Sequence, residues 1–551
     1  MKRKFLPLFS ILLLPLFLFI AANAPIQKMP DFRDALPDAE LADKIVSNMT
    51  DEELLAQILM FGWAGSEPSP QVISWVKERS LGSIKIFGWN TDNTDKVAEA
   101  VTLLQKTASK NRFHIPLFVA TDQEGGWIRH IKGRTTETPG NLAIGASGLP
   151  LDAWFSGYYI SRELRALGVN LNFAPTVDLF TDHESTIIGT RSFGEDPASA
   201  GILGASFVAG SRAAGVLTTA KHFPGHGDTR SDSHGQLPVI NITEKTLTER
   251  ELVPFQALVD AGVPAIMSGH LSFPRILDDG EPATFSKYLL NDVLRNKMGF
   301  KGLIITDDMM MNGATQYAGS VSGAVRMAIE AGNDIIESST TPGFTDALWV
   351  NTLDRMENSP DFRSRIIDAA RRVLSAKLAY FKSDNAVPIY PEVAKVDERV
   401  PDREGQAFFL SQAVRSVTLV RNKGFPYLPK KSETILIAGS FPDFLVSGTK
   451  RFPNADTAPI NRDLYARSRK YDTVIFCLSS HENLDILKDL RFLDTRIIVI
   501  SAMSPVLLSE VPWVDTALAV YSYSHWSFTA AFSALAGDFI PAGIMPLKNI
   551  E

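Results

Sequence analysis

The sequence predicts an α/β fold: an N-terminal (β/α)8 TIM-like barrel followed by a smaller open α/β sandwich domain. Eight short apolar runs alternate with segments of helical spacing, and nearly every run ends in a charged residue or a histidine. Parallel strands covered by helices are buried on both faces, so they read as continuous apolar runs. The length of 551 residues exceeds what one core usually holds and favours two domains.

The barrel strands are expected where apolar runs lie between turn residues. Ahead of the first run, Thr50 and Glu53 have the spacing of a capping box and predict the start of a helix. The eight runs occupy residues 57–65, 81–89, 115–123, 169–178, 216–225, 263–271, 302–308 and 332–338. Eight strands alternating with helices predict a closed barrel.

The whole chain divides into four expected segments. Residues 1–24 are expected to form a signal peptide, 25–384 the barrel, 385–410 a linker and 411–551 the C-terminal domain. The linker is charged and carries prolines, and four further apolar runs follow it, at 433–440, 471–480, 496–505 and 515–523. The run ILIAGS lacks the full G-x-G-x-x-G pattern, so no dinucleotide site is expected there.

The first residues have the layout of a secretory signal. A basic start at Lys2 to Lys4 precedes an apolar stretch over residues 5–20, and Ala22-Asn23-Ala24 supplies a small-x-small cleavage site. The alternative is an uncleaved signal that tethers the protein to a membrane through residues 5–20, because that stretch approaches the ~18 apolar residues that span a bilayer.

Cysteine usage and net charge limit the cellular compartments and the binding partners that the sequence predicts. The single cysteine, Cys477, cannot form an internal disulfide, and its apolar surroundings predict a buried strand residue. Export without disulfides favours a bacterial periplasm, or the cell surface or extracellular space. The net charge is -7 and no long Lys/Arg run occurs, so nucleic acid is not an expected partner.

Polar residues at the strand ends predict one shared pocket, because active sites of such barrels lie at the C-terminal mouths of the strands. For two of these residues, Asp178 and Glu337, a purely structural role is the alternative. The residues are Asp122, Glu124, Asp178, Lys221, His222, His270, Asp307, Asp308 and Glu337.

The stretch KHFPGHGDTRSDSHGQLP, residues 221–238, has two interpretations. A metal site is one, because His222 and His226 have i, i+4 spacing; however, Pro224 and Gly225 between them disfavour the helix that such a site needs. For His226 a buried structural role is equally compatible. We therefore expect no metal and no organic cofactor.

Proton transfer is the second interpretation. Asp232 and His234 lie two residues apart, so the carboxylate could orient the imidazole and raise its basicity. Asp307 ends the run GLIITDD and could attack an anomeric carbon as nucleophile. Asp308 is the adjacent alternative, but successive strand residues face opposite ways and only one can point at a sugar.

These motifs resemble glycoside hydrolase family 3, and specifically its β-N-acetylglucosaminidase (NagZ-type) branch. The likeness rests on KHFPGHGDTRSDSH and GLIITDDMMMNGA, and extends to IPLFVATDQEGG, NFAPTVD, IGTRSFGEDP and IMSGHLSFP. The region from AVRSVTLVRNKGFPYLP to ALAGDFIPAGIMP resembles the family's C-terminal domain more loosely. After DQEGG, Trp127 stands where many relatives place an arginine, and Arg129 follows two residues later.

The resemblance implies a role for each matching residue. Asp307 would be the nucleophile, and His234, oriented by Asp232, would be the general acid/base. Asp122, Arg191, Lys221 and His222 would contact sugar hydroxyls. It implies a retaining exo-β-N-acetylglucosaminidase acting on terminal N-acetylglucosamine (GlcNAc) of peptidoglycan- or chitin-derived saccharides, and the signal pattern at the N-terminus adds that the enzyme is exported. A β-glucosidase or a GlcNAc phosphorylase on the same scaffold, and a non-catalytic periplasmic sugar-binding protein, remain alternatives.

Overall fold

The N-terminal domain is a closed parallel barrel, as predicted. In the computed structural model, which describes Met1 and residues 29–550, the strand order is β10-β1-β2-β3-β6-β7-β8-β9. A parallel bridge between Ile305 and Ile335 joins the two ends of this order. The strands are β1 (Leu59–Phe61), β2 (Ser83–Ile86), β3 (Phe118–Thr121), β6 (Leu171–Asn172), β7 (Leu217–Phe223), β8 (Ala265–Ser268), β9 (Leu303–Thr306) and β10 (Ile336–Ser338). Each lies within one of the eight predicted runs.

The predicted signal peptide falls almost entirely on residues 2–28, which lie outside the described residues. Among the helices that the structure describes, none combines the length and the apolar character that crossing a bilayer requires. Cleavage and membrane tethering therefore stay predictions.

Helices surround the barrel, and their first turns show why they begin where they do. Thr50 and Glu53 form the predicted capping box of α2 (Asp51–Gln57), with Thr50 accepting from the Glu53 N–H and Glu53 accepting from the Thr50 N–H. Ser69 and Asn93 cap the next two helices by accepting hydrogen bonds from N–H groups of the first turn. The main barrel helices are α3 (Pro70–Arg79), α4 (Thr94–Ala108), α6 (Pro150–Ala166), α7 (Pro197–Ala213), α9 (Leu252–Asp260), α11 (Val321–Ala331) and α13 (Pro360–Phe381).

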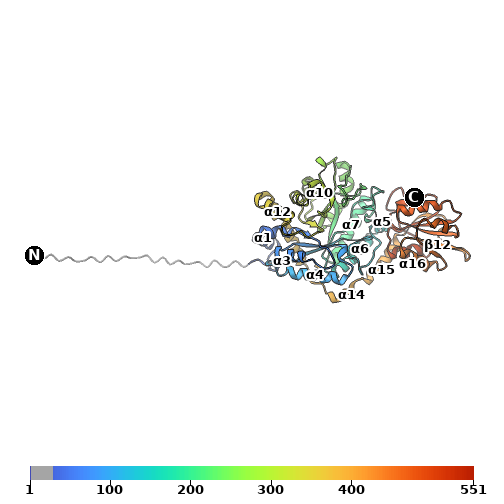
Figure 1. Ribbon diagram of the computed structural model, residues 1–551, viewed down its shortest axis with the longest axis horizontal. Helices are drawn as coiled ribbons and strands as arrows, with labels where there is room; N and C mark the ends of the chain where they lie inside the picture. The colour runs from blue at the N-terminus through green and yellow to red at the C-terminus, as the bar shows by residue number, and fades with distance from the viewer. Residues whose placement is uncertain (2–28, 551) are drawn as a thin grey trace.

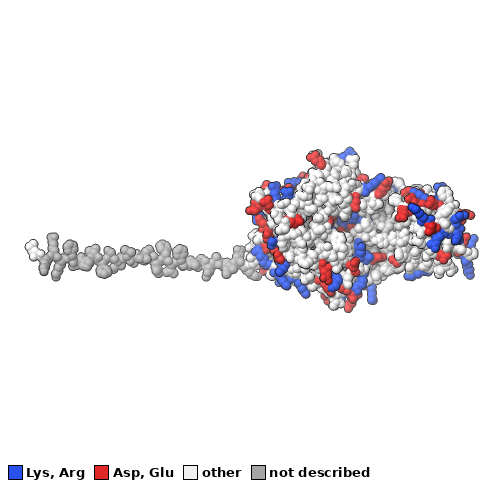
Figure 2. Space-filling model, viewed as in Figure 1, with Lys and Arg blue, Asp and Glu red and all other residues white. Residues whose placement is uncertain are grey.

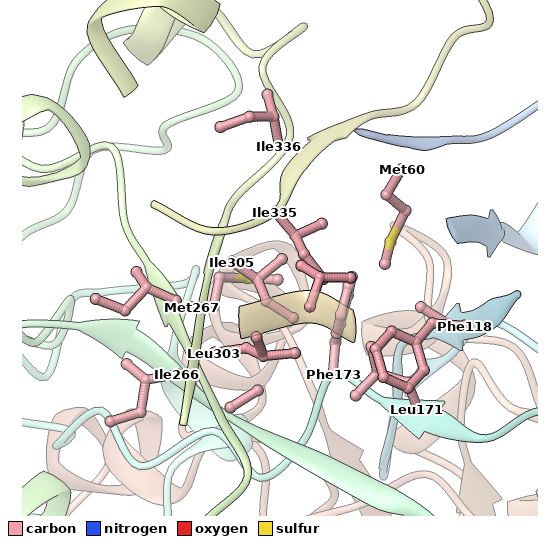
Figure 3. Packing of buried hydrophobic residues seen from close by; sticks show 14 of the residues in the cluster. Met60, Phe118, Leu171, Phe173, Ile266, Met267, Leu303, Ile305, Ile335 and Ile336 are labelled. Carbon is pink, nitrogen blue, oxygen red and sulfur yellow. The ribbon is translucent and has the colours of Figure 1, made fainter. Parts of the chain in front are cut away.

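The barrel interior is packed with apolar side chains rather than open. Figure 3 shows Met60, Phe118 and Ile305, from three different strands, and Phe173, directly after β6, in one apolar cluster, and all four are buried. Layers of side chains from alternating strands fill the interior of such barrels. Because the interior is filled, a substrate can bind only at the ends of the strands.

The segment 385–410 contains regular structure as well as connecting chain. It includes α14 (Val396–Arg399) and the start of α15 (Arg403–Ser416), whose first N–H groups are capped by Asp402. Helix α15 packs against α5 (Asn141–Ser147) and α6 of the barrel and against α19 (His525–Leu535) of the second domain. The connection is thus a helix shared by the two domains.

The second domain is a smaller open sheet with helices on its faces, as predicted. Its strand order is β11-β16-β15-β14-β12-β13, parallel except for β11. The sequence predicts four of these strands, β12 (Ile435–Ala438), β14 (Thr473–Leu478), β15 (Arg496–Ser501) and β16 (Thr516–Ala519). The edge strands β11 (Thr418–Asn422) and β13 (Asp456–Ala458) are additional. Cys477 is buried on β14, as expected.

The chain after α19 packs back against the barrel. The Ile544 N–H donates to Ala146 O at 2.8 Å, and the Glu195 N–H donates to Pro546 O at 3.3 Å. A separate apolar cluster joins the two domains there; its buried members are Leu142, Ala143, Ala146, Phe180, Ala519, Tyr521, Leu547 and Ile550. In Figure 1 the second domain, drawn in orange to red, accordingly lies beside α5 and α15.

Charged side chains are spread over the face seen in Figure 2, with both signs interspersed. This distribution fits the small net charge of -7. A face of this kind has no broad single-sign field to attract a polyanion.

Candidate active site

Asp122, the first predicted sugar-binding residue, follows β3 and is surrounded by cations. Its Oδ1 pairs with Lys221 Nζ, and its Oδ2 lies 3.1 Å from Lys85 Nζ and 3.5 Å from His130 Nδ1. Burial alone would raise the pKa of the Asp122 carboxyl, but Lys221 and Lys85 outweigh it and hold that pKa well below its usual range. An ionised, immobilised carboxylate of this kind can accept hydrogen bonds from sugar hydroxyls.

Glu124 links two more of the predicted residues to this cluster. Arg191, at the end of the short turn Gly189–Arg191, donates to both Glu124 oxygens at 2.9 and 2.8 Å. Lys221 Nζ lies 2.8 Å from Glu124 Oε1. Burial opposes ionisation of Glu124, yet Arg191 and Lys221 lower its pKa to about 2. The sequence places Glu124 at the mouth but gives it no role; the structure shows that it orients both cations.

His222, on β7, is fixed by Asp178. Its Nδ1 lies 2.7 Å from Asp178 Oδ2, and its Nε2 lies 3.5 Å from Arg191 Nη2. Asp178 also accepts from the backbone N–H groups of His222 and His226. Because Asp178 is fully occupied in this way, it acts as a support that aims the His222 ring, which agrees with the structural alternative for this residue.

Asp307 and Asp308 differ in their hydrogen bonds, and the choice between them as nucleophile stays a prediction. Asp308 Oδ1 accepts from the N–H groups of Met310 and Ser339, so it stabilises the loops. Asp307 Oδ1 accepts from the Asp308 N–H at 2.9 Å, and its side chain is partly exposed at the end of β9. Both side chains are partly exposed, and Asp307 accepts fewer backbone hydrogen bonds than Asp308, which leaves more of its carboxylate without a protein donor.

The surroundings of Asp307 keep it ionised. Burial alone would raise the pKa of its carboxyl, but His222, His270 and Lys85 stand close enough, with the hydrogen bond from Asp308, to lower it to about 2. His270 is itself held by Thr284 Oγ1 and by Asp308 O, each at 3.0 Å. The Asp307 carboxylate is therefore ionised at any pH near neutrality.

The Asp232–His234 pair is formed as predicted, on an exposed loop. His234 Nδ1 lies 2.8 Å from Asp232 Oδ1, which also accepts from the His234 N–H at 3.0 Å. Burial raises the pKa of Asp232, but its hydrogen bonds from His234 outweigh that effect and lower it. A carboxylate can only accept, so the Nδ1 proton faces Asp232 and Nε2 is left for proton transfer. The Gly313 N–H donates to Ser233 O at 3.0 Å and ties the loop to α10 (Asn312–Ala318), shortly after Asp307 in the chain.

The sequence reasoning missed Lys85. It lies on β2 and is nearly fully buried, with its Nζ between Asp122 and Glu337 at 3.1 and 3.5 Å and over the rings of Phe87 and Phe173. A lysine between two isoleucines in a strand otherwise buried on both faces was the available signal, because a buried cation needs a partner. Burial raises the pKa of Glu337 well above its usual range, more than Lys85 lowers it.

His130 was also missed, whereas Arg129 does not reach the carboxylate cluster. Burial lowers the pKa of His130 to about 4, so beside Asp122 it is a neutral ring. Arg129 instead donates to Thr135 O at 2.5 Å. Trp127, where relatives carry arginine, is 39% exposed on the neighbouring hairpin turn.

The metal interpretation of the loop finds no support in the described geometry. No group of three or more His, Cys, Asp or Glu side chains among Met1 and residues 29–550 is arranged to hold a metal ion. His226 is buried against His222, and burial lowers its pKa to about 4. Both ring nitrogens of His226 lack a hydrogen-bond partner within the described part of the chain.

Comparison with known proteins identifies the family of the barrel domain. The family profile described as glycosyl hydrolase family 3 N terminal domain matches residues 49–376. Beta-hexosaminidase A of Pseudoalteromonas piscicida is 29% identical over 401 residues, which cover 63% of this chain and 67% of that protein. The beta-hexosaminidase of Xylella fastidiosa (strain M23) is 34% identical over 286 residues, covering 51% of this chain and 82% of that protein.

The two-domain arrangement also has a counterpart. A family 3 beta-N-acetylglucosaminidase from Paenibacillus sp. str. FPU-7 superposes with a TM-score of 0.82 at 28% identity, over 91% of this chain and 99% of that one. These likenesses confirm the resemblance that the loop and strand motifs predicted. The chain therefore belongs to glycosyl hydrolase family 3 and is a glycoside hydrolase.

Proposed function

We propose that the protein is an exported, retaining exo-β-N-acetylglucosaminidase that releases terminal GlcNAc from peptidoglycan- or chitin-derived saccharides. The observation that carries the proposal is the hydrogen-bonded Asp232–His234 pair on the loop after β7, in a barrel whose mouth also holds an ionised Asp307. Relatives named beta-hexosaminidase support β-N-acetylhexosaminidase activity. The N-acetylglucosaminidase from Paenibacillus supports the narrower substrate.

The first chemical step forms a covalent glycosyl-enzyme. An Asp307 oxygen attacks the anomeric carbon, the bond from that carbon to the leaving oxygen breaks, and His234 Nε2 gives its proton to the leaving oxygen. Asp232 accepts a hydrogen bond from the Nδ1–H group throughout, and its charge stabilises the imidazolium before transfer. Asp307 loses its negative charge when it forms the ester bond.

The second step reverses these roles. His234 Nε2, now neutral, takes a proton from a water molecule whose oxygen attacks the anomeric carbon, and the ester bond to Asp307 breaks. Two displacements at one carbon retain its configuration. The released carboxylate is again stabilised by His222, His270 and Lys85.

The predicted sugar contacts have suitable chemistry for recognition. The carboxylate of Asp122 accepts from hydroxyls, while Lys221 and Arg191 donate, and His222 presents its Nε2 edge beside Arg191. Because these groups are already paired with one another, the pocket is preorganised before the sugar arrives.

A phosphorylase on the same scaffold is the second candidate. A neutral histidine as acid/base does not repel an attacking phosphate dianion as a second carboxylate would. A β-glucosidase and a non-catalytic sugar-binding protein are further alternatives. A protein that only binds sugar would not need the Asp232–His234 pair.

The test compares aryl β-N-acetylglucosaminide with aryl β-glucoside in phosphate-free buffer that contains a chelator, then repeats the assay with phosphate. Turnover of the N-acetyl substrate alone, with free sugar as product, supports the proposal. Sugar phosphate as product, at a rate that rises with phosphate, establishes phosphorolysis instead. Absence of turnover contradicts the enzymatic proposal.

Export is proposed from the N-terminal sequence pattern alone. Expression of the full chain in a Gram-negative host and sequencing of the N-terminus of the secreted protein tests it. A new N-terminus near Pro25 in the periplasmic fraction supports cleavage. Recovery of the intact chain from the membrane fraction supports a tether through residues 5–20, and recovery from the cytosol contradicts export.

A further inference from the structure

The acid/base pair lies on the exposed part of its loop, so its position depends on the contacts that hold that loop. The side chains of Asp232 and His234 are 42% and 76% exposed. Few buried apolar contacts mean that a loop can move at little cost. A histidine that must meet a leaving oxygen within hydrogen-bond distance needs a fixed loop.

One attachment is an ion-pair chain at the start of the loop. Arg250, in the π-helical segment η3 (Leu247–Glu251), places Nη2 at 2.5 Å from Asp228 Oδ2 and Nε at 2.6 Å from Glu251 Oε1. The side chain of Arg250 is 30% exposed and that of Glu251 only 1%. The guanidinium thus connects a buried carboxylate of the helix layer to the loop, with two charge-assisted hydrogen bonds.

Glu251 also contacts the backbone where the loop leaves β7. A Cβ at Gly225 would lie 2.9 Å from both the Cβ and the Oε2 of Glu251, and Gly225 has a φ of +134°. The close approach requires glycine at this position. Glu251 therefore packs on the turn before the loop and, through Arg250, holds the loop itself.

A second ion-pair attachment is weaker. Arg230 pairs with Asp182 and Glu184, but its side chain is 61% exposed, and ion pairs in water contribute little. The bond from Gly313 N–H to Ser233 O lies on the far side of the loop. Arg250 is the best-shielded cation in contact with the loop among these pairs.

We infer that Arg250 is a positioning residue that holds the Asp232–His234 pair in place for proton transfer, and that Glu251 orients its guanidinium. This inference rests on the proposed function, because it presupposes His234 as the acid/base. The ion pairs of Arg250 are with Asp228 and Glu251, away from Asp307 and the sugar-binding cations, so its loss should impair protonation of the leaving group more than sugar binding.

The test measures kcat/KM of Arg250→Met for aryl β-N-acetylglucosaminides with leaving groups of low and high pKa. We expect a loss of about tenfold or more for poor leaving groups and less than about threefold for activated ones, since general acid catalysis contributes roughly 10²–10⁴-fold where protonation is needed. Arg250→Lys should recover part of the loss, because lysine keeps the charge but cannot bridge two carboxylates in the same geometry.

Two further variants separate positioning from folding. Asp228→Asn cuts the contact to the loop and keeps the Arg250–Glu251 pair, so it should reproduce the same dependence on leaving group even if Arg250→Met folds poorly. Arg212→Met is the matched control, because Arg212 on α7 only donates to the carbonyls of Ala261 and Gly262. It should show no dependence on the leaving group.

His234→Ala distinguishes a failure of the proposed acid/base role from a failure of the positioning role of Arg250. If that variant shows no dependence on the leaving group, the proposed acid/base role fails and the positioning role fails with it. If His234→Ala shows the dependence but Arg250→Met and Asp228→Asn lose activity equally on all substrates, or lose none, the positioning role is overturned while the proposed function stands.

Discussion

Replacing Glu251 with glutamine should change how the stability of the protein depends on pH. Burial raises the pKa of the Glu251 carboxyl from its ordinary value of 4.5 to about 7; Arg250 opposes the change, and Asp178 and Asp228 add to it. Between about pH 4.5 and pH 7 the folded state keeps a proton that the unfolded state has lost. As the pH rises through this window, this carboxyl therefore reduces the free energy of unfolding.

The magnitude follows from the two pKa values. At about 1.36 kcal/mol for each pH unit, the difference between 4.5 and about 7 corresponds to about 3 kcal/mol. Glutamine has the shape of the protonated acid and does not titrate. Glu251→Gln should be close to the wild type in stability at about pH 5 and more stable than it by up to about 3 kcal/mol at about pH 8.

Urea unfolding of both proteins at the two pH values, followed by tryptophan fluorescence, measures this difference. Glu249→Gln, at an exposed position of the same π-helical segment, controls for the removal of a carboxylate as such. A gap between wild type and Glu251→Gln that is the same at both pH values would refute the reasoning. If the wild type is instead the more stable protein at high pH, Arg250 stabilises the ionised carboxylate more than burial destabilises it.

Three further predictions concern catalysis. Asp307→Ala should abolish turnover and leave the thermal unfolding temperature nearly unchanged, because a mouth carboxylate contributes little to the core; normal turnover would exclude it as nucleophile. His234→Gln should slow poor leaving groups by about 10²-fold or more and aryl substrates with activated leaving groups far less, and equal losses would indicate a binding role. Lys85→Met should move the acid limb of kcat/KM up by about one pH unit or more, because Lys85 helps to lower the pKa of Asp307 to about 2; an unchanged limb would contradict that influence.

The positions of the candidate site residues could be predicted from the sequence because the strands of a barrel all end at the same mouth. All eight strands and the mouth placement of Asp122, Lys221 and Asp307 follow from apolar runs that end in polar residues. The local Asp232–His234 pair follows from its spacing alone. Arg191 does not lie at the end of a strand, so only the family resemblance identified it.

The remaining features depend on contacts between distant segments. Lys85 and Glu337 come from strands far apart in sequence, and nothing local shows that one would face the other. The edge strands β11 and β13 are short and partly exposed, so they lack the apolar run that marks a buried strand. The support of the acid/base loop by Arg250 is likewise invisible in sequence, because an arginine on a helix usually faces water.

The return of residues 544–550 to the barrel has a consequence for how the protein is made. Leu142 and Phe180 belong to the barrel, which the ribosome synthesises first, but their partners Leu547 and Ile550 follow the whole second domain. Domains fold in order as they emerge. The barrel therefore has an uncovered apolar patch until the second domain and the residues after it have folded against it.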